Sequence, residues 1–269
     1  MTNKRPASGE PGEPGEPGQQ EALRGLLHEV DAVLVDFDGP ICDLFGSAPT
    51  AHIAEEIKVM ARQEWGIGVL DQVVEDCDDS HGILLALKDM YDRASPVPLS
   101  RTPLEEAHKI VTRHEYAAVA SAEAAPDLEP LLNALTALGM RLVVVSNNAE
   151  GPVWEYLKRE QLQSKFVDVC GRDPHEPGHM KPDPDSLLRA LKCLDGLAPS
   201  RAVMVGDQLT DLEAAQKAGV RFLGYTHDAE RMREMRQRGA DWVVDSHDPV
   251  VTAARTLVAT APGDASTPS

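Results

Sequence analysis

A short apolar run that ends in two acidic residues is the feature that most constrains this chain. Residues 32–35 are Ala-Val-Leu-Val, and Asp36-Phe37-Asp38 follows them, with Gly39-Pro40 directly after. The run has the length and composition of a buried strand, and the Gly-Pro pair ends it. Residues two apart in an extended backbone point to the same side, so both carboxylates can reach one bound group. A plain strand followed by an Asp-Gly turn is the competing interpretation.

From residue 126 onward, strand-like apolar runs alternate with amphipathic, helix-like segments. The strand-like runs are residues 141–145, 166–170, 202–206, 220–224 and 242–244. Strands that alternate with helices at this spacing predict an α/β fold with a doubly wound, mainly parallel sheet. The carboxyl ends of parallel strands share one edge of such a sheet, and ligands bind at that edge.

The segment that follows the first predicted strand has a different pattern. Between residues 46 and 124, apolar side chains recur at helical spacing, as at Ile53, Ile57 and Ala61. Thr102, followed by Pro103 and then by Glu105, has the pattern of an N-cap at the start of a helix that runs to about residue 120. These features predict an all-helical insertion in the α/β fold.

The patterns divide the chain into a core and an inserted cap. We expect residues 21–45 and 125–259 to form the core and residues 46–124 to form the helical cap. Residues 1–20, which are acidic and rich in proline, and residues 260–269, which are polar, are predicted to be disordered tails.

The charge and the apolar segments limit the partners of this chain. It has 44 acidic and 26 basic residues and a formal net charge of −18, which repels nucleic acids and anionic membranes at long range. It contains no apolar run of the ~20 residues that span a membrane, and no signal-peptide core. Its four cysteines form no CxxC pair, so neither a disulfide framework nor a zinc site is indicated. We expect a cytoplasmic protein with no nucleic-acid or membrane partner.

Polar side chains follow three of the predicted strands, and a loop supplies a lysine. The residues that should meet at the carboxyl edge are Asp36, Asp38, Ser146, Asn147, Lys181, Asp207 and Asp211. Two carboxylates ~4 Å apart repel by about 4 kcal/mol at an effective dielectric near 20, so this cluster requires a cation. Oxygen ligands suit Mg²⁺, which also accepts a substrate phosphate oxygen. The lysine, the hydroxyl and free backbone N–H groups suit the other phosphoryl oxygens.

The arrangement resembles the haloacid dehalogenase superfamily of phosphohydrolases, in particular phosphoglycolate-phosphatase-like members with a helical type 1 cap. The resemblance covers about residues 30–258. The four motifs match as Asp36-Phe37-Asp38-Gly39, Ser146, Lys181 in Lys-Pro-Asp-Pro, and residues 206–211, Gly-Asp-Gln-Leu-Thr-Asp. Pro40-Ile41 replaces the more usual Thr or Val after the glycine, which removes no reacting group.

The resemblance implies a role for each matched residue in the reaction. Asp36 would attack phosphorus and form an aspartyl-phosphate, and Asp38 would act as general acid and then as general base. Ser146 and Lys181 would hold the transferring oxygens, and Asn147 would contribute its N–H.

The resemblance also implies the metal site. Asp36, the carbonyl of Asp38 and Asp207 would bind Mg²⁺, and Asp211 would support the metal from behind, through water. Gly39 is expected beside the bound substrate.

Charged residues of the cap are candidates for contacts with the organic part of the substrate. We expect Arg62 and Arg113 to make such contacts, from a set that also holds Arg93, Arg101, His114 and residues 76–81. The alternative is that these residues only form the solvated faces of amphipathic helices. A closed cap would expel water from the phosphoryl site and select the leaving group.

The sequence therefore predicts a Mg²⁺-dependent phosphatase that hydrolyses a small phosphorylated metabolite, of the phosphoglycolate or sugar phosphate type, as a monomer or homodimer. A phosphomutase of the same fold remains open because it uses every core residue named above. A phospho-accepting signalling domain is disfavoured by the insertion and by the paired Asp36 and Asp38. An inactive relative is disfavoured by the intact motifs. A dehalogenase would not need Asp38, and nothing marks out the cap lysine that a phosphonatase needs.

Overall fold

A six-stranded sheet forms the centre of the protein. The computed structural model describes residues 17–46, 50–93 and 99–260. All neighbouring strands of the sheet are parallel, in the order β5-β4-β1-β6-β7-β8. Their bounds are Ala32–Val35 (β1), Arg141–Val145 (β4), Asp168–Cys170 (β5), Ala202–Gly206 (β6), Arg221–Tyr225 (β7) and Trp242–Val244 (β8). This confirms the predicted α/β fold with a parallel sheet.

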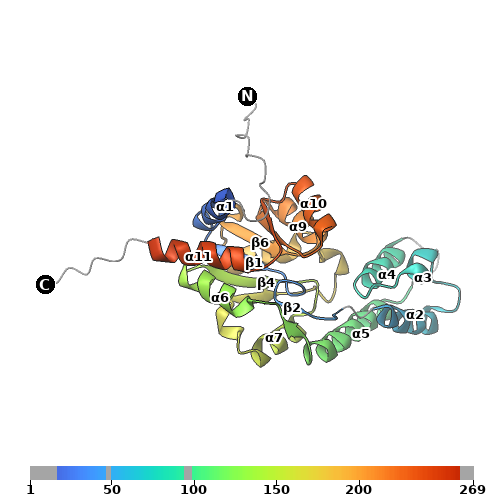
Figure 1. Cartoon of the computed structure of the whole chain (residues 1–269). Coiled ribbons are helices and arrows are strands. Elements are labelled where there is room, and N and C mark those ends of the chain that lie inside the picture. Colours follow the sequence, from blue (N-terminus) through green and yellow to red (C-terminus); the bar gives the residue numbers. More distant parts are fainter. Residues whose placement is uncertain (1–16, 47–49, 94–98, 261–269) are drawn as a thin grey trace.

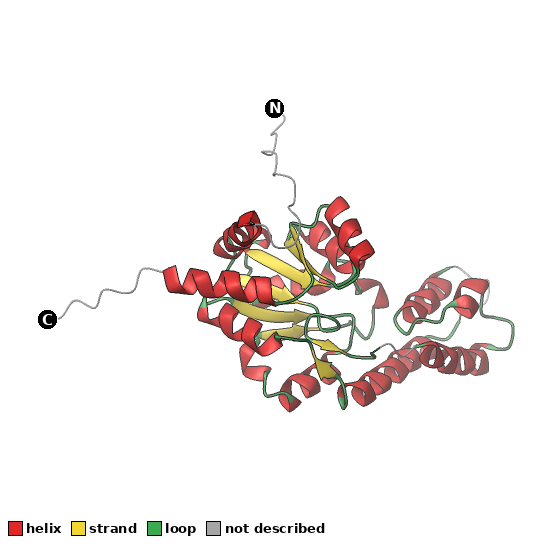
Figure 2. Ribbon diagram, in the orientation of Figure 1, coloured by secondary structure: helices red, strands yellow, loops and turns green. Residues whose placement is uncertain are grey.

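Helices cover both faces of the sheet, because the side chains of each strand alternate between two apolar clusters. Val33 and Val35 of β1 join one cluster, and Ala32 and Leu34 join the other. The first face carries α1 (Pro17–His28), α6 (Leu128–Ala137), α7 (Glu150–Arg159) and α11 (Asp248–Thr260). The second carries α8 (Asp185–Cys193), α9 (Leu209–Ala218) and α10 (Ala229–Gln237). Figure 1 and Figure 2 show this layered arrangement.

The position of β1 brings the predicted functional residues together. In the register of the sheet, Val35 lies beside Val144 of β4 and Val205 of β6. The backbone N–H of Asp36 extends this ladder with a 2.9 Å hydrogen bond to the carbonyl of Val205. The loops that follow β1, β4 and β6 therefore start side by side at the carboxyl edge.

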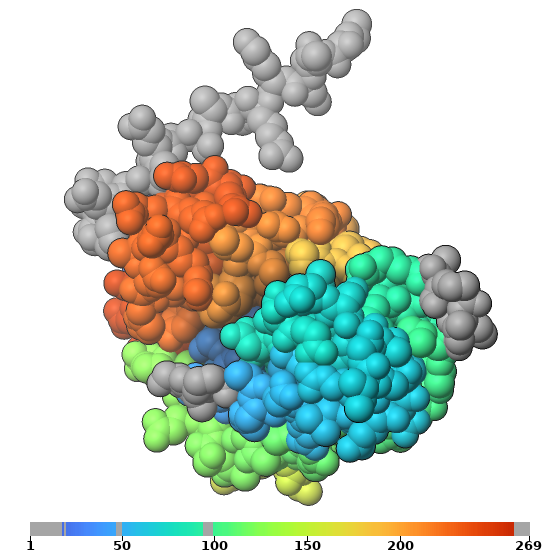
Figure 3. All heavy atoms as spheres, turned by 90° about the vertical axis from the view of Figure 1, so that its right-hand side faces the viewer, coloured from blue at the N-terminus to red at the C-terminus, as the bar shows by residue number. Residues whose placement is uncertain are grey.

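The insertion after β1 forms a separate helical lobe beside that edge. Its helices are α2 (Ala51–Trp65), α3 (Gln72–Asp76), α4 (Gly82–Asp92) and α5 (Thr102–Val119), and they pack around a third apolar cluster, which Met180 of the core also joins. The lobe, which we call the cap, lies at the right of Figure 1 and faces the viewer in Figure 3. The chain enters and leaves it through β2 (Cys42–Asp43) and β3 (Glu123–Ala124), which pair antiparallel. The two connections to the core therefore lie together.

The structure corrects three sequence-based expectations on helix ends. Helix α1 begins at Pro17, inside the predicted tail of residues 1–20, because Leu23, Leu26 and Leu27 of this helix are buried against the sheet. Helix α5 includes Thr102, with Arg101 as its N-cap, and the Ser100 hydroxyl accepts the N–H of Thr102. The third correction, at α9, concerns the active site and is described below. Residues 1–16 and 261–269 of the predicted tails lie outside the described residues.

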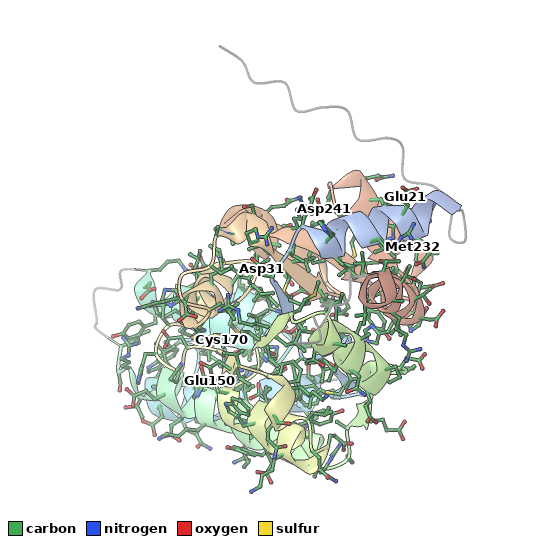
Figure 4. All side chains as sticks on the ribbon, turned by 90° about the vertical axis from the view of Figure 1, so that its left-hand side faces the viewer. Glu21, Asp31, Glu150, Cys170, Met232 and Asp241 are labelled. Atoms are coloured by element: carbon green, nitrogen blue, oxygen red, sulfur yellow. The ribbon has the colours of Figure 1, made fainter. Side chains whose placement is uncertain are left out.

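The opposite edge of the sheet carries charged residues that pair with one another, such as Arg221 with Glu29 and Arg141 with Asp195. Figure 4 shows Asp31 before β1 and Asp241 before β8 at this amino edge. Asp31 pairs with Arg201, and Asp241 accepts the N–H of Phe222 at 2.8 Å. Each carboxylate is thus individually satisfied. None of the described helices is long and apolar enough to span a bilayer.

Candidate active site

The side chains predicted from the sequence line one cavity at the carboxyl edge. The cavity has a volume of about 120 Å³. Its wall includes Asp36, Asp38, Ser146, Asn147, Lys181, Asp207 and Asp211. A larger cavity of about 840 Å³ adjoins it, and Asp38, Gly39 and Asp207 belong to the wall of the larger one. Loops from β1, β4 and β6 thus converge as the strand order requires.

Lys181 is the electrostatic centre of the cavity. Its side chain is 2% exposed, and its ammonium lies 2.8 Å from Oδ1 of Asp36 and 2.6 Å from Oδ1 of Asp211. The ammonium also donates to the carbonyl of Val145 at 3.2 Å. Burial alone would lower the pKa of Lys181, but the two carboxylates outweigh burial and raise it, so the lysine is charged at neutral pH.

The side chain of Asn147 fixes the position of Lys181. Its Oδ1 accepts the N–H of Lys181 at 2.8 Å, and its Nδ2 donates to the carbonyl of Lys181 at 3.2 Å. This side chain is therefore occupied in joining the loop after β4 to the lysine loop. Any contact of Asn147 with a substrate falls to its backbone N–H.

Three carboxylates around Lys181 form the candidate metal centre. Asp36, Asp207 and Asp211 each place a carboxylate oxygen within 4.8 Å of the others. Burial, followed by the charge of Asp211, raises the pKa of Asp36 well above its ordinary value. The same two causes raise the pKa of Asp207 to about 7. Clustered oxygen donors that repel one another when ionised are the set that a hard cation such as Mg²⁺ requires, so these residues fit that metal.

Asp211 is held by the start of helix α9. The helix is capped by Gln208, and the Asp211 carboxylate accepts the N–H of Gln208 at 2.9 Å through Oδ2. In the sequence, Thr210 followed three residues later by Glu213 predicts a capping box, with Thr210 as the N-cap. This prediction is wrong because the helix begins one residue before Thr210, at Leu209. With one oxygen on Gln208 and the other on Lys181, Asp211 is arranged to support the centre rather than to reach a substrate.

Gly39 allows the loops that follow β1 and β6 to approach each other closely. Its φ of 94° lies in the region that favours glycine, and a Cβ there would lie 2.7 Å from Cγ of Asp207. Any larger residue would push Asp207 away from the Asp36 loop.

Asp38, one residue before Gly39, is held by the backbone and is partly buried. Its carboxylate accepts the N–H of Leu44 at 2.9 Å, and burial raises its pKa. A raised pKa suits a carboxyl group that must donate a proton near neutral pH.

A buried ion pair joins the cap to this site. Glu115 of α5 and Arg172, which follows β5, are both fully buried, with Nη1 of Arg172 2.7 Å from Oε1 of Glu115. Glu115 also accepts the N–H of Ala149 at 3.1 Å and the side-chain amide of Asn148 at 3.2 Å. Asn148 in turn accepts the hydroxyl hydrogen of Ser146 at 2.9 Å. The pair therefore fixes the loop that carries Ser146 and Asn147.

The structure does not bring the predicted cap arginines to the cavity. Arg62 pairs with Glu55 and Glu75, and Arg113 pairs with Glu56. Both lie on the outer surfaces of cap helices and neither lines the catalytic cavity. Both arginines pair with carboxylates of the cap itself, as expected if they belong to the solvated faces of amphipathic helices.

The comparisons with known proteins agree with the geometry. Residues 30–219 match the model of a hydrolase family described as haloacid dehalogenase-like hydrolase. The chain belongs to this family. A phosphoglycolate phosphatase of Neisseria meningitidis is 30% identical over 237 residues, which cover 83% of this chain and 93% of the relative.

Two further similarities concern a part of the sequence and the fold. A phosphoglycolate phosphatase of Rhodospirillum rubrum is 41% identical over 102 residues, 38% of this chain and 41% of the relative. The crystal structure of CbbY from Rhodobacter sphaeroides in complex with phosphate shares the fold, with a TM-score of 0.54 and 24% identity over 81% of this chain and 94% of that one. The predicted resemblance to phosphoglycolate-phosphatase-like members is confirmed, and the enzyme is a phosphatase.

Sequence reasoning missed the Glu115–Arg172 pair. Two signals were present: Glu115 interrupts an apolar stripe with Val111 and Val119 at spacings of four, and Arg172 follows a strand at the same edge as the other site residues. A charged residue within a buried stripe requires an opposite charge.

Removal of one partner of this pair should destabilise the hydrolase. We expect Glu115→Ala to lower the free energy of unfolding by about 3 kcal/mol, because it leaves Arg172 buried and unpaired. Urea denaturation measures this. The double variant Glu115→Leu, Arg172→Met should lose less free energy of unfolding than the sum of the losses in the single variants Glu115→Leu and Arg172→Met. Additive losses would contradict a direct interaction.

The raised pKa of Asp207 predicts a variant that is more stable than the wild type. A carboxyl whose pKa is raised on folding costs stability above the folded pKa, about 7, and the cost disappears as the pH falls toward its unfolded value of 3.8. In EDTA, Asp207→Asn should therefore raise stability at pH 8 by an amount on the order of 2 kcal/mol, and by much less at pH 5.

Asp31→Asn is the matched control for this measurement. The pKa of Asp31 is lowered, chiefly by its hydrogen bond with Arg201, so this substitution should not stabilise the protein at pH 8. Equal melting temperatures of wild type and Asp207→Asn at pH 8 would show that the carboxylates do not repel one another in the metal-free protein.

Proposed function

We propose that this phosphatase hydrolyses a small organic phosphate monoester, of the phosphoglycolate or sugar phosphate type, in the cytoplasm and through an aspartyl-phosphate on Asp36. The observation that carries the proposal is the ammonium of Lys181 between Asp36 and Asp211, in a cavity that also holds Asp38. The names of the similar phosphoglycolate phosphatases support this substrate class.

The first half of the reaction transfers the phosphoryl group to the protein. The Asp36 carboxylate attacks phosphorus, and the bond from phosphorus to the bridging oxygen breaks. Asp38, whose raised pKa keeps a proton available, donates that proton to the leaving alcohol. Lys181 offsets the negative charge of the transferring oxygens at a place where water is largely excluded.

The second half releases inorganic phosphate. Asp38, now ionised, accepts a proton from a water molecule as that water attacks the aspartyl-phosphate, and the Asp36 carboxylate is regenerated. The Ser146 hydroxyl, once it turns its hydrogen from Asn148 to a phosphoryl oxygen, and the backbone N–H of Asn147 keep the phosphoryl group in place between the two steps.

Mg²⁺ fits the carboxylate cluster and would be held by Asp36, Asp207 and the backbone carbonyl of Asp38, with Asp211 behind them. When bound, it would neutralise the charge shared by these carboxylates and the phosphoryl oxygens. It would also offset the burial and the repulsion by Asp211 that together raise the pKa of Asp207. Because the net charge of the protein is −18, its overall charge does not attract an anionic ester.

Substitution of the nucleophile should abolish turnover without loss of the fold. Asp36→Asn should lower kcat by about 10³-fold or more, because an amide neither attacks phosphorus nor leaves it as a carboxylate does. Phosphate release from 2-phosphoglycolate, sugar phosphates and 4-nitrophenyl phosphate measures this, with circular dichroism to check folding. Asp31→Asn, at the opposite edge of the sheet, is the control and should keep wild-type activity. A near-normal kcat in Asp36→Asn would exclude the proposed nucleophile.

Chelation tests the metal assignment. Phosphate release should fall to background in excess EDTA and return when Mg²⁺ exceeds the chelator, because without the metal the carboxylates repel the anionic substrate. EDTA already saturated with Mg²⁺ is the control and should not inhibit. Full turnover in EDTA would contradict the assignment of a metal ion to the carboxylate cluster.

A further inference from the structure

One described residue of the cap reaches the catalytic cavity. His81 lines it together with Asp36 and Asp38, whereas the other described residues of the cap do not. The cap candidates Arg93 and His114 pair elsewhere, with Asp71 and with Glu56. Among the described residues of the cap, His81 is therefore the one placed to contact a substrate group inside this cavity.

The ring of His81 is oriented by the buried pair that joins cap and core. Its Nε2 lies 3.3 Å from Oε1 of Glu115. Burial alone would raise the pKa of Glu115, but Arg172 outweighs it and the pKa falls to about 2. Glu115 is therefore a carboxylate, which only accepts hydrogen bonds, so Nε2 of His81 carries the hydrogen and donates it. This leaves Nδ1 as the ring atom for a ligand.

The place of His81 in the cavity indicates which part of a substrate it meets. His81 lines the same cavity as Asp38, the residue proposed to serve the leaving alcohol. Asp38 and Asp207 line both this cavity and the larger one that adjoins it. A ligand group that contacts both Asp38 and His81 is therefore part of the leaving group.

We propose that His81 binds an oxygen substituent, hydroxyl or carboxylate, on the leaving group of the substrate through Nδ1, and that Glu115 is the positioning residue that orients its ring. The inference rests on the proposed function, because it names what the same site selects. A neutral ring accepts the hydrogen of a hydroxyl, and a protonated ring donates to a carboxylate.

One substitution separates the two nitrogens of the ring. His81→Gln places an amide near the position of Nε2 and so retains the Glu115 contact, but it has no counterpart of Nδ1. We expect it to lower kcat/KM by about 10-fold or more for 2-phosphoglycolate or glycerol 3-phosphate. For 4-nitrophenyl phosphate, which has no such oxygen beside the ester, we expect a change below about 3-fold. The carboxylate and hydroxyl esters show which substituent is bound.

His114→Gln is the matched control, since His114 is a cap histidine that pairs with Glu56 away from the cavity. It should leave all three rates unchanged. Glu115→Gln tests the positioning role: its effect on kcat/KM for the preferred ester should be smaller in the His81→Gln background than in the wild type. Equal effects in both backgrounds would show that Glu115 does not act through His81.

A binding measurement separates failure of this inference from failure of the proposed function. In the Asp36→Asn protein, the imidazole NMR signals of His81 are assigned as those missing from the Asp36→Asn, His81→Gln double variant. These signals should shift when 2-phosphoglycolate or glycerol 3-phosphate is added. If the wild type hydrolyses no ester but the His81 signals shift, the proposed function fails and the binding role stands. If hydrolysis is normal in His81→Gln and its signals do not respond to either ester, the inference is overturned.

Discussion

The ammonium of Lys181 is the interaction on which this site depends. It lies within 2.8 Å of Asp36 and 2.6 Å of Asp211, and all three side chains are almost fully buried. Without this charge, carboxylates from the loops after β1 and β6 would repel one another at the edge of the sheet. Lys181 offsets only part of the unfavourable environment, because burial, followed by the charge of Asp211, keeps the pKa values of Asp36 and Asp207 raised. The site therefore has a cost in stability that a cation would remove, as is common where function requires like charges to be close.

The cap is joined to the core by two very different kinds of contact. The short antiparallel pair of β2 and β3 holds the two connecting segments together. The buried pair of Glu115 and Arg172 instead ties helix α5 to the loop after β4, which carries Ser146. Separation of the two partners would leave a buried charge unpaired and so destabilise the fold. The pair therefore fixes the orientation of α5 relative to this loop. His81, which we propose to select the substrate, and Ser146, which we propose to bind the phosphoryl group, thus belong to one hydrogen-bonded network through Glu115 and Asn148.

Much of the fold and the core of the site could be predicted from sequence, because both depend on local patterns. Apolar runs that alternate with amphipathic helices define a parallel sheet, and polar residues directly after the strands share one edge of it. Thr210 was misassigned as a helix cap because Gln208, a less common cap, begins the helix first. The roles of Arg62 and Arg113 depended on which carboxylates lie near them after folding, and a helical spacing carries no such information. Glu115 was recognisable as a misplaced charge, but its partner became visible only in three dimensions.

The most direct test of this account is a search for the phosphorylated enzyme during turnover. The wild-type protein, mixed with Mg²⁺ and an ester that it hydrolyses, is quenched in acid within one turnover and its peptides are weighed by mass spectrometry. The account predicts one added phosphoryl group on the peptide that contains Asp36, and none in the Asp36→Asn protein. A phosphoryl group on another residue, or rapid turnover with no phosphorylated peptide, would contradict it.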